Sequence, residues 1–237
     1  MSEWKAKRFW TRTHLVEEGG GFGIWLDDRP VRTPGKAPLV VPSRALGDAI
    51  VAEWDTQVEE INPNLMPLTR ATNSAIEKIA VQRPDVVAML AEYGATDLLC
   101  YRAKHPDALI HRQAEAWDPL LDWAERELAA LLIPVAGVMF HPQPDTSLAR
   151  LTALVEAHDD FELVALHDLI ALSGSLVVAL AISKGRLDAT AAWPLTRIDE
   201  TFEEEDWGVD QEAAALAERK RGDFLQAERL LKLVREP

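Results

Sequence analysis

The stretch from Phe161 to Ser183 is dominated by apolar residues, and between Leu169 and Ile182 it contains no charged side chain. A membrane-spanning helix needs about 20 consecutive apolar residues, and charged residues flank this shorter run on both sides. We therefore predict one buried helix over 161–183, which several other helices must cover because it is apolar on every side. The small residues 173–175 indicate either a notch for close helix packing, which we favour, or a functional kink. The run predicts a helical bundle.

The composition limits the kinds of partner that the chain can bind. Its 237 residues carry a formal charge of −14, whereas nucleic-acid-binding proteins concentrate Lys and Arg to displace counterions. We expect no nucleic-acid partner. The single cysteine, Cys100, excludes an internal disulfide and a multi-cysteine zinc cluster, as is usual in a reducing compartment. The first ten residues contain no hydrophobic segment typical of a secretory signal, so we expect a cytoplasmic protein.

Residues 7–41 show the short, alternating pattern of β-strands. Side chains from Phe9 to Leu15 alternate between two faces, and the glycines at 19–21 predict a hairpin turn. Ser43 suits a helix N-cap, and apolar residues then recur at helical spacing from Arg44 to Val58. This part of the sequence predicts a small antiparallel sheet with one helix packed on it.

Pro63 and Pro67 interrupt the pattern and mark a domain boundary. We predict a β-rich domain over residues 1–64 and an α-helical bundle over residues 65–237, which together form an α+β fold. The sequence after the boundary reads as helical, with helices expected at 69–80, 86–93, 107–132, 146–158, 161–183, 188–206 and 210–235.

Sequence motifs for nucleotide or metal chemistry are incomplete. The Gly-Lys-Ala sequence at 35–37 lacks the upstream glycine and the hydroxyl of a phosphate-binding loop, and GGGFG lacks the strand-then-helix setting of a dinucleotide loop. No two histidines form a metal-binding pair at helical spacing with a carboxylate base. Cys100 and His105 could act as nucleophile and base, but without a third orienting group a buried, inert Cys100 is favoured. We expect no catalysis, no metal and no cofactor.

The acidic segment IDETFEEEDWG covers residues 198–208 and permits three interpretations. It can be a solvated helix face, a partner-binding surface, or, less readily, a pair of carboxylates for catalysis or calcium binding. Tryptophan is unusually frequent, with eight residues. Trp117 and Trp123 read as core, whereas Trp54, Trp193 and Trp207 lie at helix ends or beside charges, where a ring can anchor a partner. For Trp54 the core is the favoured interpretation.

Six stretches together resemble the assembly chaperones of the F-type ATP synthase that bind its α subunit. They run in the family's order from Phe9 to Ala214 and read LDDRPVRTPGKAPLVVPSRALGDAIVAEWDTQ, MPLTRATNSAIE, TDLLCYR, WDPLLDWA, SGSLVVALA and DETFEEEDWGVD. The resemblance implies a small β-rich N-terminal domain, a larger orthogonal helical bundle and no catalysis. It also implies that the protein binds the newly made α subunit and keeps it soluble until the β subunit replaces it.

The same resemblance points to partner-binding residues. Glu200 stands at an acidic position of the family pattern, Asp199, Glu203 and Trp207 belong to the same segment, and Arg70 matches the start of the second domain. The family's usual Gln is replaced by Glu203, which adds charge. We expect a monomer that does not insert into membranes, in the bacterial cytoplasm because the targeting extension of mitochondrial members is missing. Two alternatives stay open: a non-catalytic adaptor for another protein, and a small-molecule enzyme.

Overall fold

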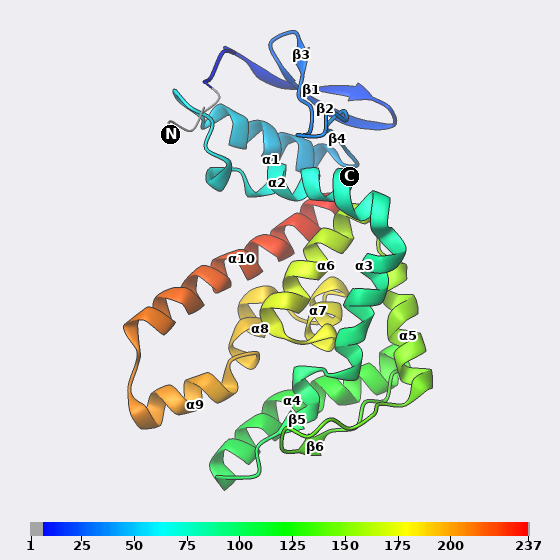
Figure 1. Ribbon diagram of the computed structural model, residues 1–237, viewed down its shortest axis with the longest axis vertical. Helices are drawn as coiled ribbons and strands as arrows, with labels where there is room; N and C mark the ends of the chain where they lie inside the picture. The colour runs from blue at the N-terminus through cyan, green and yellow to red at the C-terminus, as the bar shows by residue number, and fades with distance from the viewer. Residues whose placement is uncertain (1–6, 237) are drawn as a thin grey trace. The chain divides into compact units, whose positions relative to one another are not determined.

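The computed structural model describes residues 7–236, which form two compact units (Figure 1). The first unit contains the described chain up to Arg83, together with Asp160–Ala165 and the C-terminal residues from Arg229 onward. The second contains Pro84–Asp159 and Leu166–Glu228. The predicted division into a β-rich domain over residues 1–64 and a helical bundle over residues 65–237 stays a prediction.

Strands and helices follow the predicted α+β class, which is confirmed. The strands are β1 (Thr13–Glu18), β2 (Gly21–Leu26), β3 (Arg29–Pro30), β4 (Val40–Val41), β5 (Tyr101–Arg102) and β6 (Val135–Ala136). The α-helices are α1 (Arg44–Asp55), α2 (Pro67–Ser74), α3 (Ala80–Glu92), α4 (Asp107–Leu128), α5 (Asp145–Glu156), α6 (Asp160–Ser173), α7 (Leu176–Ser183), α8 (Ala189–Leu195), α9 (Ile198–Trp207) and α10 (Gln211–Arg235).

The first unit is an antiparallel sheet with α1 packed on β1 and β2 (Figure 1). Strands β1 and β2 form the predicted hairpin, and its turn residues Gly19 and Gly20 have φ angles of 61° and 81°, which glycine adopts without steric cost. Strands β3 and β4 both pair with β2. The Ser43 hydroxyl accepts a hydrogen bond from the Leu46 amide at 3.1 Å, so the predicted N-cap is confirmed.

A buried carboxylate joins α1 to α2. Glu53 on α1 accepts hydrogen bonds from the backbone amides of Leu68 and Thr69, at 2.7 and 2.9 Å, and from the Thr69 hydroxyl at 2.8 Å. These amides belong to the first turn of α2, whose N–H groups have no partner within their own helix. Glu53 therefore caps a helix whose first residue, Pro67, lies 14 residues later in the chain.

The predicted single helix over 161–183 is wrong in one respect, because it is two helices, α6 and α7. The chain breaks at Gly174, whose φ of 70° is incompatible with a continuous helix. Ser175 then caps α7 by accepting a hydrogen bond from the Val178 amide at 3.0 Å. At the end of α6 the Ser173 hydroxyl donates a hydrogen bond to the carbonyl of Leu169, at 2.6 Å. The buried character was predicted correctly, since every residue of α7 is buried.

Two further expectations for the second unit need correction. The predicted helix over 188–206 is divided into α8 and α9, because α8 ends at Leu195, one residue after Pro194. The unit is also not purely helical, since β5 and β6 form a short parallel pair. Across residues 7–236, no helix combines the length and the hydropathy needed to cross a bilayer.

Candidate partner-binding site

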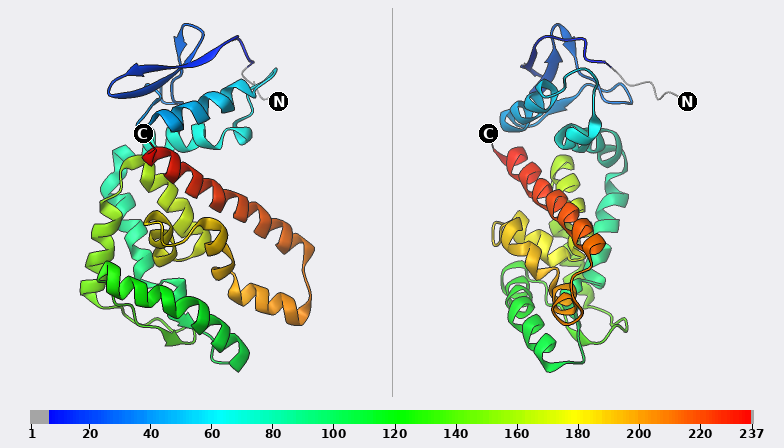
Figure 2. Two further views of the ribbon diagram at one scale, coloured as in Figure 1. Left: turned by 180° about the vertical axis from the view of Figure 1, so that it is seen from behind. Right: turned by 90° about the vertical axis from the view of Figure 1, so that its left-hand side faces the viewer.

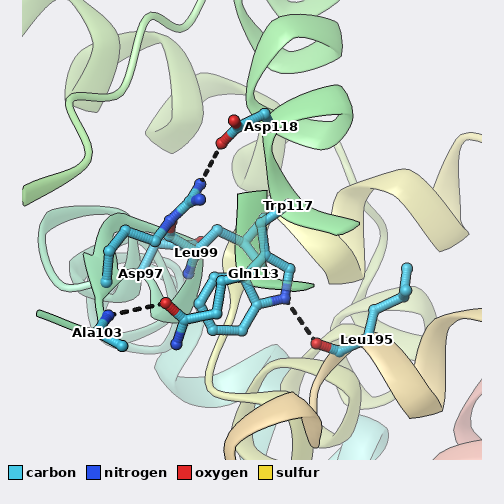
Figure 3. A network of polar contacts seen from close by, with 8 residues as sticks. Asp97, Leu99, Ala103, Gln113, Trp117, Asp118 and Leu195 are labelled. Atoms are coloured by element: carbon cyan, nitrogen blue, oxygen red, sulfur yellow. Dashed lines mark hydrogen bonds and ion pairs between the residues drawn. The ribbon is translucent and has the colours of Figure 1, made fainter. Parts of the chain in front are cut away.

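A network of hydrogen bonds joins the first turn of α9 to α4. The Gln113 side chain accepts a hydrogen bond from the Ala103 amide at 2.8 Å (Figure 3) and donates one to the Asp199 carboxylate at 2.6 Å. The Trp117 indole N–H donates to the carbonyl of Leu195 at 2.7 Å, which satisfies one of the free carbonyls at the end of α8. These contacts place the acidic helix at a defined position in the second unit.

The acidic residues of α9 differ in how their charges are balanced. Glu205 forms a two-pronged ion pair with Arg112, both N–O distances being 2.8 Å, and this hydrogen bonding lowers the pKa of Glu205. Arg197 lies 3.3 Å from Glu204 but 3.7 Å from Glu200. Glu203 has no ion-pair partner among residues 7–236. The segment is therefore not one uniform solvated face, since Glu204 and Glu205 are paired, whereas Glu203 and Asp206 have no ion-pair partner within residues 7–236 and Glu200 has only the longer contact with Arg197.

A hollow of about 360 Å³ lies between α9 and the first turns of α10. Its α9 side includes Glu200, Glu203 and Trp207, and its α10 side includes Ala213, Leu216 and Lys220. Figure 2 shows from behind how the chain turns after α9 and continues into α10. The lining combines an apolar ring and an exposed leucine with four carboxylates and two cationic side chains, those of Arg197 and Lys220, so that negative charge predominates. Such a surface is suited to a protein segment that has both apolar and basic side chains.

The tryptophans divide clearly by exposure. Trp117 and Trp123 are buried, as predicted, with 1% and 3% of their surface exposed. The interpretation of Trp193 as a partner anchor is wrong, because its ring is buried against Phe224 with centroids 5.4 Å apart. Trp54 is half-buried beside Trp10. Trp207 is 88% exposed, and an exposed indole is a frequent anchor in protein interfaces.

The structure brings together three of the five residues suggested by the resemblance, namely Glu200, Glu203 and Trp207. Asp199 points instead to Gln113 on α4. Arg70 is exposed on α2 and belongs to the first unit. The contribution of α10 was not predicted, because Leu216 and Lys220 have no local motif and reach the hollow only through the turn after Trp207.

The sequence left open a nucleophilic role for Cys100, and the surroundings of its thiol argue against that role. Cys100 is buried, and its desolvation, assisted by the nearby Asp97 charge, raises the pKa of the thiol to about 12. The predicted burial of Cys100 is confirmed. No group of three or more His, Cys, Asp or Glu residues that could hold a metal ion occurs within residues 7–236.

We expect Asp199 to contribute to folding rather than to binding. Asp199→Ala leaves the buried amide of Gln113 without its acceptor, which should lower the free energy of unfolding by about 1 to 2 kcal/mol. Urea denaturation measures this loss. Glu203→Ala is the control on the same helix, because an exposed, unpaired side chain should change stability by no more than about 0.5 kcal/mol. Equal stability of the two variants would contradict the structural role of Asp199.

Comparison with known proteins shows which family the chain resembles in sequence and structure. Residues 7–125 match the model of a family described as ATP12 chaperone protein. The mitochondrial protein atp12 of Schizosaccharomyces pombe is 26% identical over 222 residues, which are 87% of this chain and 75% of that protein. The crystal structure of Atp12 from Paracoccus denitrificans has a TM-score of 0.95 at 52% identity and covers 98% of this chain and 100% of its own. The Agrobacterium tumefaciens protein Atu1473 matches with a TM-score of 0.89 at 41% identity, covering 96% of this chain and 85% of its own. With a matching family model over half its length and close structural relatives over nearly all of it, this chain belongs to the ATP12 chaperone family.

Proposed function

We propose that this protein is an assembly chaperone for the catalytic head of the F-type ATP synthase and that its client is the unassembled α subunit. The observation that carries the proposal is the similarity to Atp12 of Paracoccus denitrificans along almost the whole chain. The α subunit as client is the expectation from the sequence resemblance. A ring subunit without its neighbours exposes apolar surface that aggregates unless it is covered.

The hollow between α9 and α10 is our proposed contact surface for this client. Trp207 supplies an exposed apolar ring, and Glu200 and Glu203 supply negative charge next to it. Arg70 stays a proposed contact from the first unit. The protein acts without catalysis or cofactor, and one monomer covers one client until the β subunit displaces it. We place it in the cytoplasm of a bacterium.

The test uses purified α subunit of an F-type ATP synthase, whose aggregation on dilution from denaturant is followed by light scattering. We expect one chaperone per α subunit to suppress this aggregation. Adding the β subunit should then release the α subunit from the chaperone. An unrelated protein that aggregates under the same conditions is the control for unspecific protection. Failure to bind the α subunit, or equal protection of both proteins, would contradict the proposal.

The alternative of an adaptor for another protein predicts a different result in cells. Affinity purification of the tagged protein from its native cells should return the α subunit if it is an assembly chaperone. Recovery of a different protein in one-to-one amount, without the α subunit, would favour the adaptor.

A further inference from the structure

A second exposed surface lies on the loop after β6, far from α9 in sequence. Residues 138–140, Val-Met-Phe, follow each other at the tip of this loop with 90%, 79% and 64% of their surfaces exposed. Isolated exposed apolar residues are common in folded proteins, whereas three in succession on a loop make a contiguous exposed apolar surface, a feature that marks interaction sites when it is large. We call residues 138–140 the apolar tip.

The base of the loop is held firmly although its tip is exposed. The buried side chain of Gln143 accepts a hydrogen bond from the Ile133 amide at 2.7 Å and donates one to the Ile133 carbonyl at 3.0 Å. The Gly137 amide donates to the Arg102 carbonyl at 2.7 Å, which extends the pairing of β6 with β5. Loops closed at the base in this way are compact and frequently functional.

The same frame supports the apolar tip and the acidic helix. Strand β5 is joined to α4 by the ion pair of Arg102 with Asp118 at 2.8 Å (Figure 3). The Ala103 amide, next to β5, bonds to Gln113, which also holds Asp199 of α9. Both surfaces therefore project from elements attached to α4 within the second unit.

Charge distinguishes the apolar tip from the rest of the chain. Residues 129–144 contain no Asp, Glu, Lys or Arg, although the whole chain carries 39 acidic residues. The charge adjacent to the loop is positive, because the Lys104 side chain lies against Gly137, with Cε 2.6 Å from where a Cβ atom would be. No residue within 7–236 forms an ion pair with Lys104. This surface is complementary to an apolar recess that has a carboxylate at its edge.

We propose that the apolar tip inserts into such a recess on the unassembled α subunit, as a second contact that is separate from the hollow between α9 and α10. The inference rests on the proposed function. A protein recess fits better than a membrane surface, since binding to anionic lipid takes clusters of about 4 to 8 basic residues and residues 129–144 contain no Lys or Arg. Lys104 pairs with the carboxylate at the edge of the recess and orients the insertion.

The experiment compares three variants with the wild-type protein for binding to purified α subunit. The combined Met139→Ser and Phe140→Ser variant removes the apolar tip, Lys104→Glu reverses the adjacent charge, and Val81→Ser is the control at an apolar side chain that is 73% exposed elsewhere. We expect the tip variant to raise the dissociation constant at least about tenfold, because two large side chains are no longer buried on binding. Lys104→Glu should weaken binding mainly at low salt, and Val81→Ser should not change it. Melting temperatures should be equal for all, because these side chains are exposed.

The outcomes separate the two proposals. If the wild-type protein and the tip variant bind the α subunit equally, the tip contact is refuted while the chaperone function stands. If the wild-type protein does not bind the α subunit, the function falls, and this inference falls with it. Binding of the wild-type protein to vesicles of phosphatidylcholine and phosphatidylglycerol that the tip variant loses, with α-subunit binding unchanged, would assign the tip to membranes and overturn the proposal.

Discussion

Replacing Asp97 by Ala should lower the free energy of unfolding by about 3 to 5 kcal/mol, a large part of the stability of an ordinary domain, because several buried donors lose their acceptor. The Asp97 carboxylate is completely buried and accepts hydrogen bonds from the Ser175 hydroxyl at 2.7 Å and from the amides of Leu99 and Val177, each at 3.0 Å. Alanine leaves these three donors buried without an acceptor. Two of them lie where α7 begins, so the loss affects the central helix of the second unit. Urea denaturation of wild type and variant measures the difference, and a loss below about 1 kcal/mol would contradict it.

The pH dependence offers an independent test of the same site. Burial raises the pKa of Asp97 from 3.8 to about 6, against the hydrogen bonds that favour the ionised form. Between these values the folded state keeps the proton that the unfolded state has released. Stability contributed by Asp97 is therefore fully present below about pH 4 and is lost as the pH rises through 6, by about 3 kcal/mol as an order of magnitude.

Asp97→Asn is the matched variant, because it has nearly the same shape and does not titrate. The stability advantage of the wild type over Asp97→Asn should decrease between pH 4.5 and 7, while titration of all other groups cancels in the difference. A difference that is constant over this range, or that increases with pH, would show that Asp97 is ionised throughout.

Trp207→Ala and Glu200→Lys should each abolish most of the affinity for the α subunit without unfolding the chaperone. Truncating an interface tryptophan commonly costs 2 kcal/mol or more, so we expect a dissociation constant that is higher by about 30-fold or more. Glu200→Lys replaces attraction by repulsion and leaves the basic partner group unpaired, a loss of about 2 to 5 kcal/mol. Because Trp207 is 88% exposed and the Glu200 side chain 53% exposed, the melting temperatures should stay close to that of the wild type.

Glu92→Lys is the control for the charge reversal, since Glu92 is likewise exposed on a helix of the second unit. It changes the net charge as Glu200→Lys does and should leave binding intact. If both reversals weaken binding equally, the effect comes from the overall charge and not from the hollow. A much lower melting temperature of Glu200→Lys would instead assign Glu200 to folding, through its ion pair with Arg197 at an N–O distance of 3.7 Å.

The sequence predicted well those features that depend on neighbouring residues. The hairpin turn at Gly19 and Gly20 needs positive φ angles within a short segment, and the N-cap of α1 needs a hydroxyl three residues before the amide that it binds. Burial of Trp117 follows from helical periodicity, and burial of α7 from an uninterrupted apolar sequence. The segments that resemble the chaperone family are likewise contiguous in the chain.

Features that depend on distant residues required the tertiary structure. Hydrophobicity predicts one helix over 161–183, yet the helix breaks at Gly174, and the beginning of α7 finds acceptors on Asp97, 78 residues away from Ser175. The acidic residues of α9 looked equivalent in sequence, but Gln113 binds Asp199 across 86 positions and Arg112 binds Glu205 across 93. Sequence by itself determined which segments are buried and where local turns and caps occur, because these follow from periodicity and backbone preference. Only the tertiary structure decided which carboxylates are neutralised and which remain beside Trp207, because ion pairs and buried hydrogen bonds join groups that folding brings together from distant parts of the chain.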